Sequence, residues 1–188
     1  MKEFLALFLA LGLTATLSAE KLDLGAGRSA QLTVPAGWIA SKVMDGLPAG
    51  PATATSVRYV TKNGSNDAVL ITLLPVPDEQ FADPAVLQEM IEESTRQFAE
   101  ASVEHKAFLK DFKVAGKSGY ACLFTDDGLV GLPTKKDDYK TLTACYVYLG
   151  DHLLLVAMIF SDDPTAPAFT EARRLVQSLA LTASQKPI

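Results

Sequence analysis

The two cysteines are the residues whose chemistry follows most directly from the sequence. Cys122 and Cys145 are the only cysteines, and each lies in a run of apolar, aromatic and β-branched residues typical of a strand. If these strands pair as antiparallel neighbours, the two residues come within the Cα separation that a disulfide accepts. We therefore expect a disulfide between Cys122 and Cys145 in an oxidising compartment. The alternative is two buried free thiols that pack as small apolar side chains.

The two histidines do not belong to a recognisable catalytic motif. His105 follows the apolar stripe of a predicted helix, and His152 follows a Gly-Asp turn. A serine hydrolase would need one of them between a nucleophilic serine and a carboxylate, and the sequence contains no nucleophile-elbow motif. We therefore predict that the protein is not an enzyme, with a small hydrolase as the alternative.

Three pairs of aspartates could supply oxygen ligands to a cation. They lie at residues 126–127, 137–138 and 162–163. The first two bracket one loop, but they lack the alternating spacing of a dedicated calcium loop. The third directly precedes a predicted helix, where an aspartate would cap free N–H groups. The sequence therefore predicts no metal site and no cofactor, and solvated carboxylates account for the first two pairs.

The loop at residues 127–140 is the best candidate for a binding site. Leu129, Val130 and Leu132 lie among glycines and a proline, and Lys135 and Lys136 follow closely. A small apolar tip with a charged rim is typical of a modest protein-contact site, and the loop is longer than a simple connection requires. We expect these residues to contact another protein. The alternative is that the apolar side chains fold back onto the body of the protein.

Apolar periodicity and turn residues predict a largely antiparallel sheet with two helices packed on it. Strands are expected at residues 29–34, 56–61, 68–74, 108–114, 119–125, 141–149 and 152–160. The last of these is apolar from residue 153 onwards, which favours a central position covered on both faces. Helices are expected from Asp83 to about residue 103 and from about residue 164 to 179. Trp38 follows a Pro-x-Gly turn and is expected to fill the core.

Residues 1–19 have the pattern of a signal peptide. Lys2 precedes an apolar run at residues 4–13, and small and polar residues end at Ala19. The run falls short of the roughly 18 residues that a spanning helix needs, so no stable membrane insertion is expected. Residues 20–188 should form one periplasmic or secreted domain with a short frayed tail. The net charge of −5 disfavours nucleic acid and anionic lipid as partners.

Several short motifs resemble the PsbP-like fold, which includes the extrinsic PsbP subunit of photosystem II, Ran-binding Mog proteins and bacterial periplasmic proteins of the DcrB kind. The matching segments are residues 34–38 (VPAGW), 114–116 with Gly119, 176–179, and a helix after a proline-rich break. The resemblance implies an α+β fold with α/β/α layers, a largely antiparallel sheet of about six or seven strands and two main helices. It also implies a non-enzymatic role in binding or assisting other proteins, and no functional residue of the family can be matched onto this chain.

These observations together predict an exported, non-catalytic accessory protein of the bacterial envelope that binds another protein. An immunity or chaperone-like protein that binds a secreted effector is the alternative within the binding class, because some bacterial relatives of this fold serve secretion systems. The small hydrolase is the alternative from another class. A histidine within hydrogen-bond distance of both a serine and a carboxylate would favour the hydrolase, whereas an exposed tip at residues 129–132 would favour binding.

Overall fold

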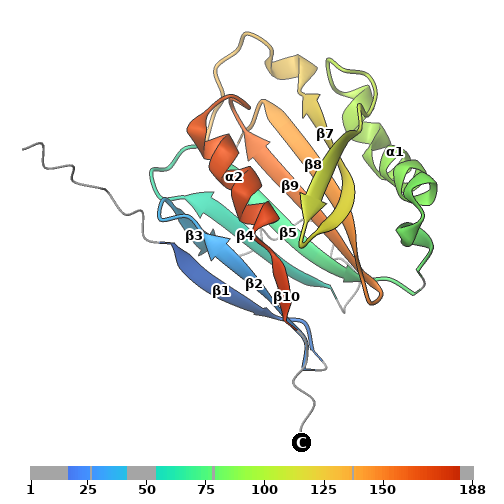
Figure 1. The fold of residues 1–188 in the computed structure, drawn as a ribbon. Coiled ribbons are helices and arrows are strands. Elements are labelled where there is room, and N and C mark those ends of the chain that lie inside the picture. Colours follow the sequence, from blue (N-terminus) through green and yellow to red (C-terminus); the bar gives the residue numbers. More distant parts are fainter. Residues whose placement is uncertain (1–16, 26, 42–53, 78, 137, 183–188) are drawn as a thin grey trace, which may run out of the picture.

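A seven-stranded antiparallel sheet forms the centre of the molecule (Figure 1). The computed structural model describes residues 17–25, 27–41, 54–77, 79–136 and 138–182. In spatial order the strands are β3 (Trp38–Ser41), β4 (Thr55–Thr61), β5 (Ala68–Pro75), β9 (Leu153–Ser161), β8 (Thr141–Gly150), β7 (Lys117–Thr125) and β6 (Lys110–Val114). The central position of β9, predicted from its unbroken apolar sequence, is confirmed.

A second, three-stranded sheet packs against the first. Its order is β1 (Ser18–Asp23), β2 (Ser29–Val34) and β10 (Ala180–Thr182). β2 has the predicted bounds but pairs here rather than in the main sheet. The sequence did not predict β1, β3 or β10. The residues of β1 show no apolar alternation and lie across the predicted cleavage site, and β3 and β10 have only four and three residues. The tail was predicted to fray beyond Leu181, but Thr182 still belongs to β10. Residues 1–16 of the predicted signal peptide and residues 183–188 of the tail lie outside the described residues.

The two helices begin differently from each other. Helix α1 (Pro84–Glu100) has the predicted cap, because the Asp83 carboxylate accepts a hydrogen bond from Ala85 N at 2.9 Å. Helix α2 (Pro167–Gln177) begins three residues later than predicted, with Ala166 as its N-cap and no side-chain cap. Two short 3-10 helices, η1 (Gln80–Ala82) and η2 (Asp127–Leu129), complete the set in the described chain. No helix of the described residues is long and apolar enough to cross a bilayer.

The aspartates at 162–163 therefore do not cap α2, and that prediction is wrong. Asp163 instead accepts hydrogen bonds from the N–H and the hydroxyl of Thr165, at 2.8 and 2.7 Å. Asp162 accepts from Asn66 Nδ2 at 3.1 Å and from Thr134 Oγ1 at 2.7 Å. Asp163 thus forms a local turn, whereas Asp162 joins segments that are distant in the sequence. The spacing of the residues alone does not reveal such a long-range contact.

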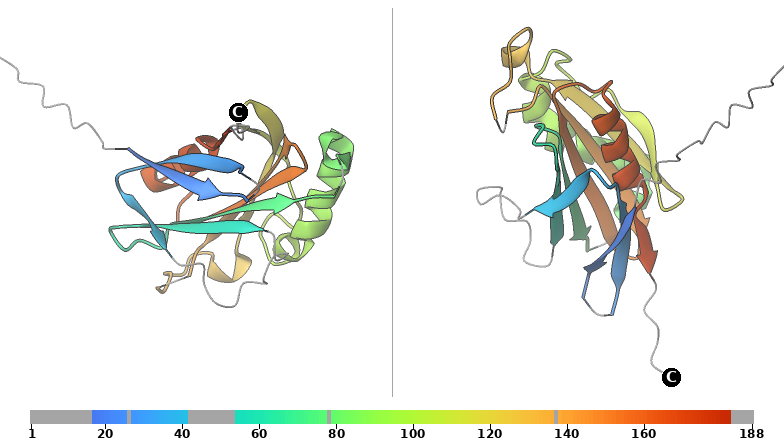
Figure 2. Two further views of the ribbon diagram at one scale, coloured as in Figure 1. Left: turned by 90° about the horizontal axis from the view of Figure 1, so that it is seen from below. Right: turned by 90° about the vertical axis from the view of Figure 1, so that its left-hand side faces the viewer.

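Each face of the main sheet has its own apolar core. The two helices lie on opposite faces of this sheet (Figure 2). We call the face that packs against α2 and the small sheet the α2 face. Trp38 is 2% exposed in this core, which confirms its predicted role. We call the opposite face the α1 face; there Leu87 and Ile91 of α1 pack with side chains of β7 and β8. The arrangement is an α+β fold with a helix on each face of a largely antiparallel sheet, as predicted.

Candidate functional site

Two apolar side chains of the predicted tip are exposed in the structure. The tip lies in the segment of residues 126–140, which connects β7 to β8. Val130 is 59% exposed and Leu132 is 53% exposed, whereas Leu129 at the end of η2 is half-buried. Val130 and Leu132 therefore do not fold back onto the sheet, and Leu129 only partly does so.

Hydrogen bonds hold the first part of this segment in place. Asp126 Oδ1 accepts from Gly128 N at 2.9 Å, which closes the turn into η2. Asp126 N donates to Lys140 O at 2.9 Å, which joins the two ends of the segment. Asp127 N donates to Ala101 O at 3.3 Å, in the connection that follows α1. The tip is therefore presented on a backbone that is tied to two neighbours.

The second part of the segment is bonded to the β4–β5 turn and to the residues after β9. Asn66 Nδ2 donates to Lys135 O at 2.9 Å. Thr134 Oγ1 donates to Asp162, and Lys135 N donates to Asp138 Oδ2 at 3.2 Å. The predicted rim residues Lys135 and Lys136 are both exposed. Because the backbone is held at both ends, binding through the tip needs little additional ordering of the chain.

A third exposed apolar residue lies on the neighbouring connection. Val103 is 51% exposed, and its N–H donates to Thr125 O at 2.9 Å beside the start of the tip segment. We call Val103, Val130 and Leu132 the apolar end. The two connections that carry them lie at the same end of the molecule (Figure 1). Sequence reasoning missed Val103, because a single apolar residue after a helix carries no binding signal by itself.

The expected disulfide between Cys122 and Cys145 is not formed, and both thiols are free. Their strands are antiparallel neighbours, as predicted. The register, however, pairs Cys122 with Ala144 and Ala121 with Cys145. This offset of one residue directs the two side chains to opposite faces of the sheet. Cys122 belongs to the core under α1 and Cys145 to the core under α2.

Neither thiol is suited to nucleophilic chemistry. Burial raises the pKa of the Cys122 thiol to about 12, and burial raises the pKa of the Cys145 thiol to about 12 as well. A thiol acts as a nucleophile or a metal ligand through its thiolate, which is therefore almost absent at neutral pH. Both cysteines thus act as small apolar core residues, which is the alternative that the sequence left open.

The histidines and the acidic pairs show no catalytic or metal-binding arrangement within the described chain. No hydrogen bond among the described residues involves a histidine side chain. His152 takes part only through its backbone, which donates its N–H to Tyr148 Oη at 3.3 Å and accepts from Val76 N at 2.8 Å. Asp126 and Asp138 accept backbone N–H groups, and residue 137 lies outside the described residues. No group of three or more His, Cys, Asp or Glu residues in the described chain could hold a metal ion.

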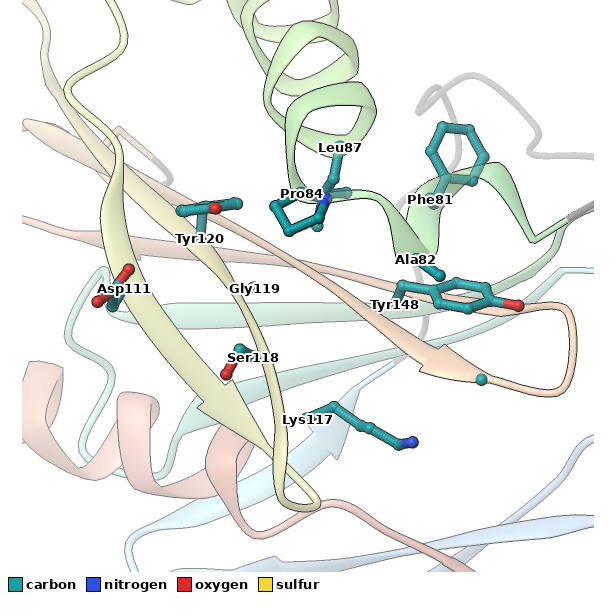
Figure 3. A pocket seen from close by; sticks show the side chains of 11 residues that line it. Phe81, Ala82, Pro84, Leu87, Asp111, Lys117, Ser118, Gly119, Tyr120 and Tyr148 are labelled. Carbon is teal, nitrogen blue, oxygen red and sulfur yellow. The ribbon is translucent and has the colours of Figure 1, made fainter.

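A hollow of about 350 Å³ lies between the start of α1 and the β6–β7 hairpin (Figure 3). Phe81, Tyr120 and Tyr148 supply aromatic walls, while Lys117 and Asp111 extend from the hairpin. Because one cation and one carboxylate both line the hollow, its charges favour neither an anionic nor a cationic ligand. The hollow is therefore a weaker candidate for a specific site than the apolar end.

The protein is similar in fold to several solved structures. No family model matches it, and no curated protein sequence matches it. The solution structure of cyanobacterial PsbP from Synechocystis sp. PCC 6803 has a TM-score of 0.54 at 13% identity, covering 92% of this chain and 96% of that one. Despite the low identity, this likeness confirms the PsbP-like fold that the motifs predicted.

Two further solved structures are similar at lower scores. The Ran-binding protein Mog1p of Saccharomyces cerevisiae has a TM-score of 0.45 at 15% identity, covering 87% of this chain and 95% of that one. LpqN of Mycobacterium tuberculosis, described as involved in cell envelope biogenesis, has a TM-score of 0.41 at 15% identity, covering 89% and 92%.

Proposed function

We propose that this protein is an exported, non-catalytic accessory protein of the bacterial envelope, and that it acts by binding another protein through its apolar end. The observation that carries the proposal is the exposure of Val130 and Leu132 on a hydrogen-bonded segment. Isolated exposed apolar residues are common, but ordered ones gathered at one end of a molecule are typical of contact sites.

The energetics favour a modest interface. Burying a valine or leucine side chain against a partner contributes about 1.5–3 kcal/mol. The hydrogen bonds of Asp126 and Thr134 already order the segment, so less conformational entropy is lost on binding. Lys135 and Lys136 lie beyond the tip, where charges influence the association rate more than the final affinity.

Export is compatible with the way in which β1 pairs. Cleavage after Ala19 would remove the first two of the six residue pairs between β1 and β2 and leave the pairing from Glu20 to Asp23. We expect mass spectrometry of protein from the periplasmic or secreted fraction to find a mature chain that starts at Glu20. An intact Met1 on protein recovered from that fraction would contradict cleavage.

The test of binding is a double substitution, Val130→Ser with Leu132→Ser. Both side chains are more than half exposed, so the free energy of unfolding should change by only about 0.5 kcal/mol. The mature variant should capture markedly less of the partner from the envelope fraction than the wild type does. The identity of the captured protein distinguishes an envelope partner from a secreted effector, which is the alternative within the binding class.

The matched control is Ile39→Ser. Ile39 is 45% exposed on β3, an edge strand of the main sheet, and it is not part of the apolar end. This variant should capture the partner as the wild type does. Equal capture by the double variant, at unchanged melting temperature, would exclude the apolar end as the binding site. A loss of folding in the double variant would show that the two residues belong to the core.

A further inference from the structure

A cavity of about 560 Å³ lies on the α1 face, beside the β4–β5 turn. Strands β4, β5 and β9 supply its floor, and residues Lys136 and Tyr139 of the tip segment supply one wall. Helix α1 packs farther along the sheet, against β7, so the half-buried side chains of this floor are not covered by it. The volume lies within the range of roughly 300–1,000 Å³ that is usual for small-molecule sites.

The floor of this cavity is apolar. Val60, Leu70 and Phe160 come from three adjacent strands and are all half-buried. The ring of Tyr139 meets the ring of Phe160 edge-on, with centroids 4.5 Å apart, and so fixes the wall against the floor. An apolar ligand body placed here would cover surface that otherwise remains in contact with water.

Two cations line the same cavity, and neither belongs to an ion pair among the described residues. Arg58 projects from β4 and Lys136 from the tip segment. Within the described residues the one ion pair joins Arg96 and Glu93, far along α1. The cavity also contains Asp67, but its two carboxylate oxygens accept from Ser161 Oγ and Ser65 Oγ, each at 2.7 Å. These hydroxyl groups are neutral and leave the charge of Asp67 in place, so the lining carries two positive charges and one negative charge. The cavity therefore combines an apolar floor with a net positive charge.

We propose that this cavity binds a small amphipathic anion, with its carboxylate or phosphate head against Arg58 and Lys136 and its apolar body on the floor of Val60, Leu70 and Phe160. A guanidinium can hold such an oxyanion through two parallel hydrogen bonds, and a lysine adds a second positive charge. The aromatic hollow in Figure 3 has no such excess of positive charge, because one carboxylate, Asp111, balances one cation, Lys117. The proposal does not depend on the apolar end.

The test uses decanoate and decyl phosphate as probes in isothermal titration calorimetry on the full mature protein. Decanol, which lacks the charge, and propionate, which lacks the long apolar body, should bind much more weakly than either probe. Arg58→Gln and Lys136→Gln should each weaken binding of the anionic probes by roughly tenfold, because a charge-assisted hydrogen bond is lost. Arg58→Lys, which keeps the charge, should lose less. The proposal is supported if decanoate or decyl phosphate binds more tightly than decanol and propionate do. The tighter of the two anionic probes identifies the head group as a carboxylate or a phosphate.

Matched variants separate this site from general charge effects and from the proposed function. Lys113→Gln removes an exposed cation from β6, at the opposite edge of the sheet, and should leave probe binding unchanged. The Val130→Ser, Leu132→Ser variant should also bind the probes as the wild type does. The proposal is overturned if neither anion binds, if decanol binds as tightly as decanoate, or if the folded Arg58→Gln, Lys136→Gln double variant retains wild-type affinity.

Discussion

Gly119 allows β7 to approach the backbone of β8 where no other residue would fit. A Cβ atom at this position would lie 2.1 Å from Tyr146 O and 2.8 Å from Val147 Cα. Both are backbone atoms of a central strand, so they cannot move aside without disturbing the sheet. The position therefore requires glycine because of the close approach, and not because of an unusual backbone angle.

We expect Gly119→Ala to lower the free energy of unfolding by about 3 kcal/mol, measured by urea denaturation. The matched control is Gly37→Ala, where the added Cβ would meet only a carboxylate oxygen of Glu171 at 3.9 Å, an ordinary contact. The control should change stability far less. A Gly119→Ala protein as stable as the control would show that β7 and β8 are farther apart than described.

The two cysteines make a second prediction at the scale of single residues. Because Cys122 and Cys145 lie on opposite faces, unfolded protein that has never been reduced should show two reactive thiols per chain. The native protein should react slowly, since both side chains are buried. If the unfolded monomer has no reactive thiols, this prediction is wrong and the two cysteines form a disulfide.

Burial of the thiols also predicts how stability depends on pH. The pKa of each is raised to about 12 in the folded protein, above its ordinary value of 9.0. Above pH 9 the unfolded thiols release protons while the folded ones retain them, so their stabilising contribution is full below pH 9 and declines as pH rises towards 12. At pH 10 the loss should be about 1 kcal/mol per thiol.

Denaturation between pH 8 and pH 10 measures this loss, with the Cys122→Ala, Cys145→Ala double variant as the comparison. Burial also raises the pKa of the Tyr59 phenol, and that group is present in both proteins. The variant should lose less stability across the interval. Parallel pH profiles for the two proteins would contradict the assignment to the thiols.

At the scale of elements, the two helix N-termini differ in a way that can be measured. Asp83 caps α1 through its carboxylate, whereas Ala166 occupies the N-cap of α2 with φ −67° and ψ 152° and supplies no side-chain acceptor. The extended backbone at Ala166 is the conformation that a capping serine adopts. The same kind of hydrogen bond is therefore present at one helix and absent at the other.

Asp83→Ala should destabilise the protein by about 1 kcal/mol, and Ala166→Ser should stabilise it by a similar or smaller amount. Chemical denaturation of both single variants and the double variant checks the signs. Since the helices pack on opposite faces of the sheet, the two effects should add. Destabilisation by Ala166→Ser would indicate that α2 does not begin at Pro167.

At the scale of the whole molecule, two cores share one sheet. Strands β7, β8 and β9 contribute alternate side chains to the core under α1 and to the core under α2. If these strands separate, both cores lose side chains at the same time. We therefore expect the described chain to unfold as one unit.

Two probes on opposite faces test this expectation. Trp38 fluorescence reports on the α2 face, and protection of the Cys122 thiol from labelling reports on the α1 face. Their transitions in urea should coincide. Exposure of Cys122 at a lower urea concentration than the fluorescence change would show that the α1 layer opens independently.

Local patterns were sufficient to predict much of this protein. The apolar run of β9 determined its central position, Asp83 determined the start of α1, and the glycine-rich apolar tip identified Val130 and Leu132 as candidates for contact. Each of these depends on residues that are close in sequence, because strand alternation, helix capping and turn formation are local properties.

Only the tertiary structure decided the rest. A register difference of one residue separated Cys122 from Cys145, and alternation along either strand cannot reveal which residues are paired across them. The short strands β1, β3 and β10 depend on the neighbours with which they pair. Arg58 and Lys136 meet at one cavity because the strand order places their distant segments together. Side-chain convergence of this kind is set by non-local pairing, which the sequence pattern of a single segment does not contain.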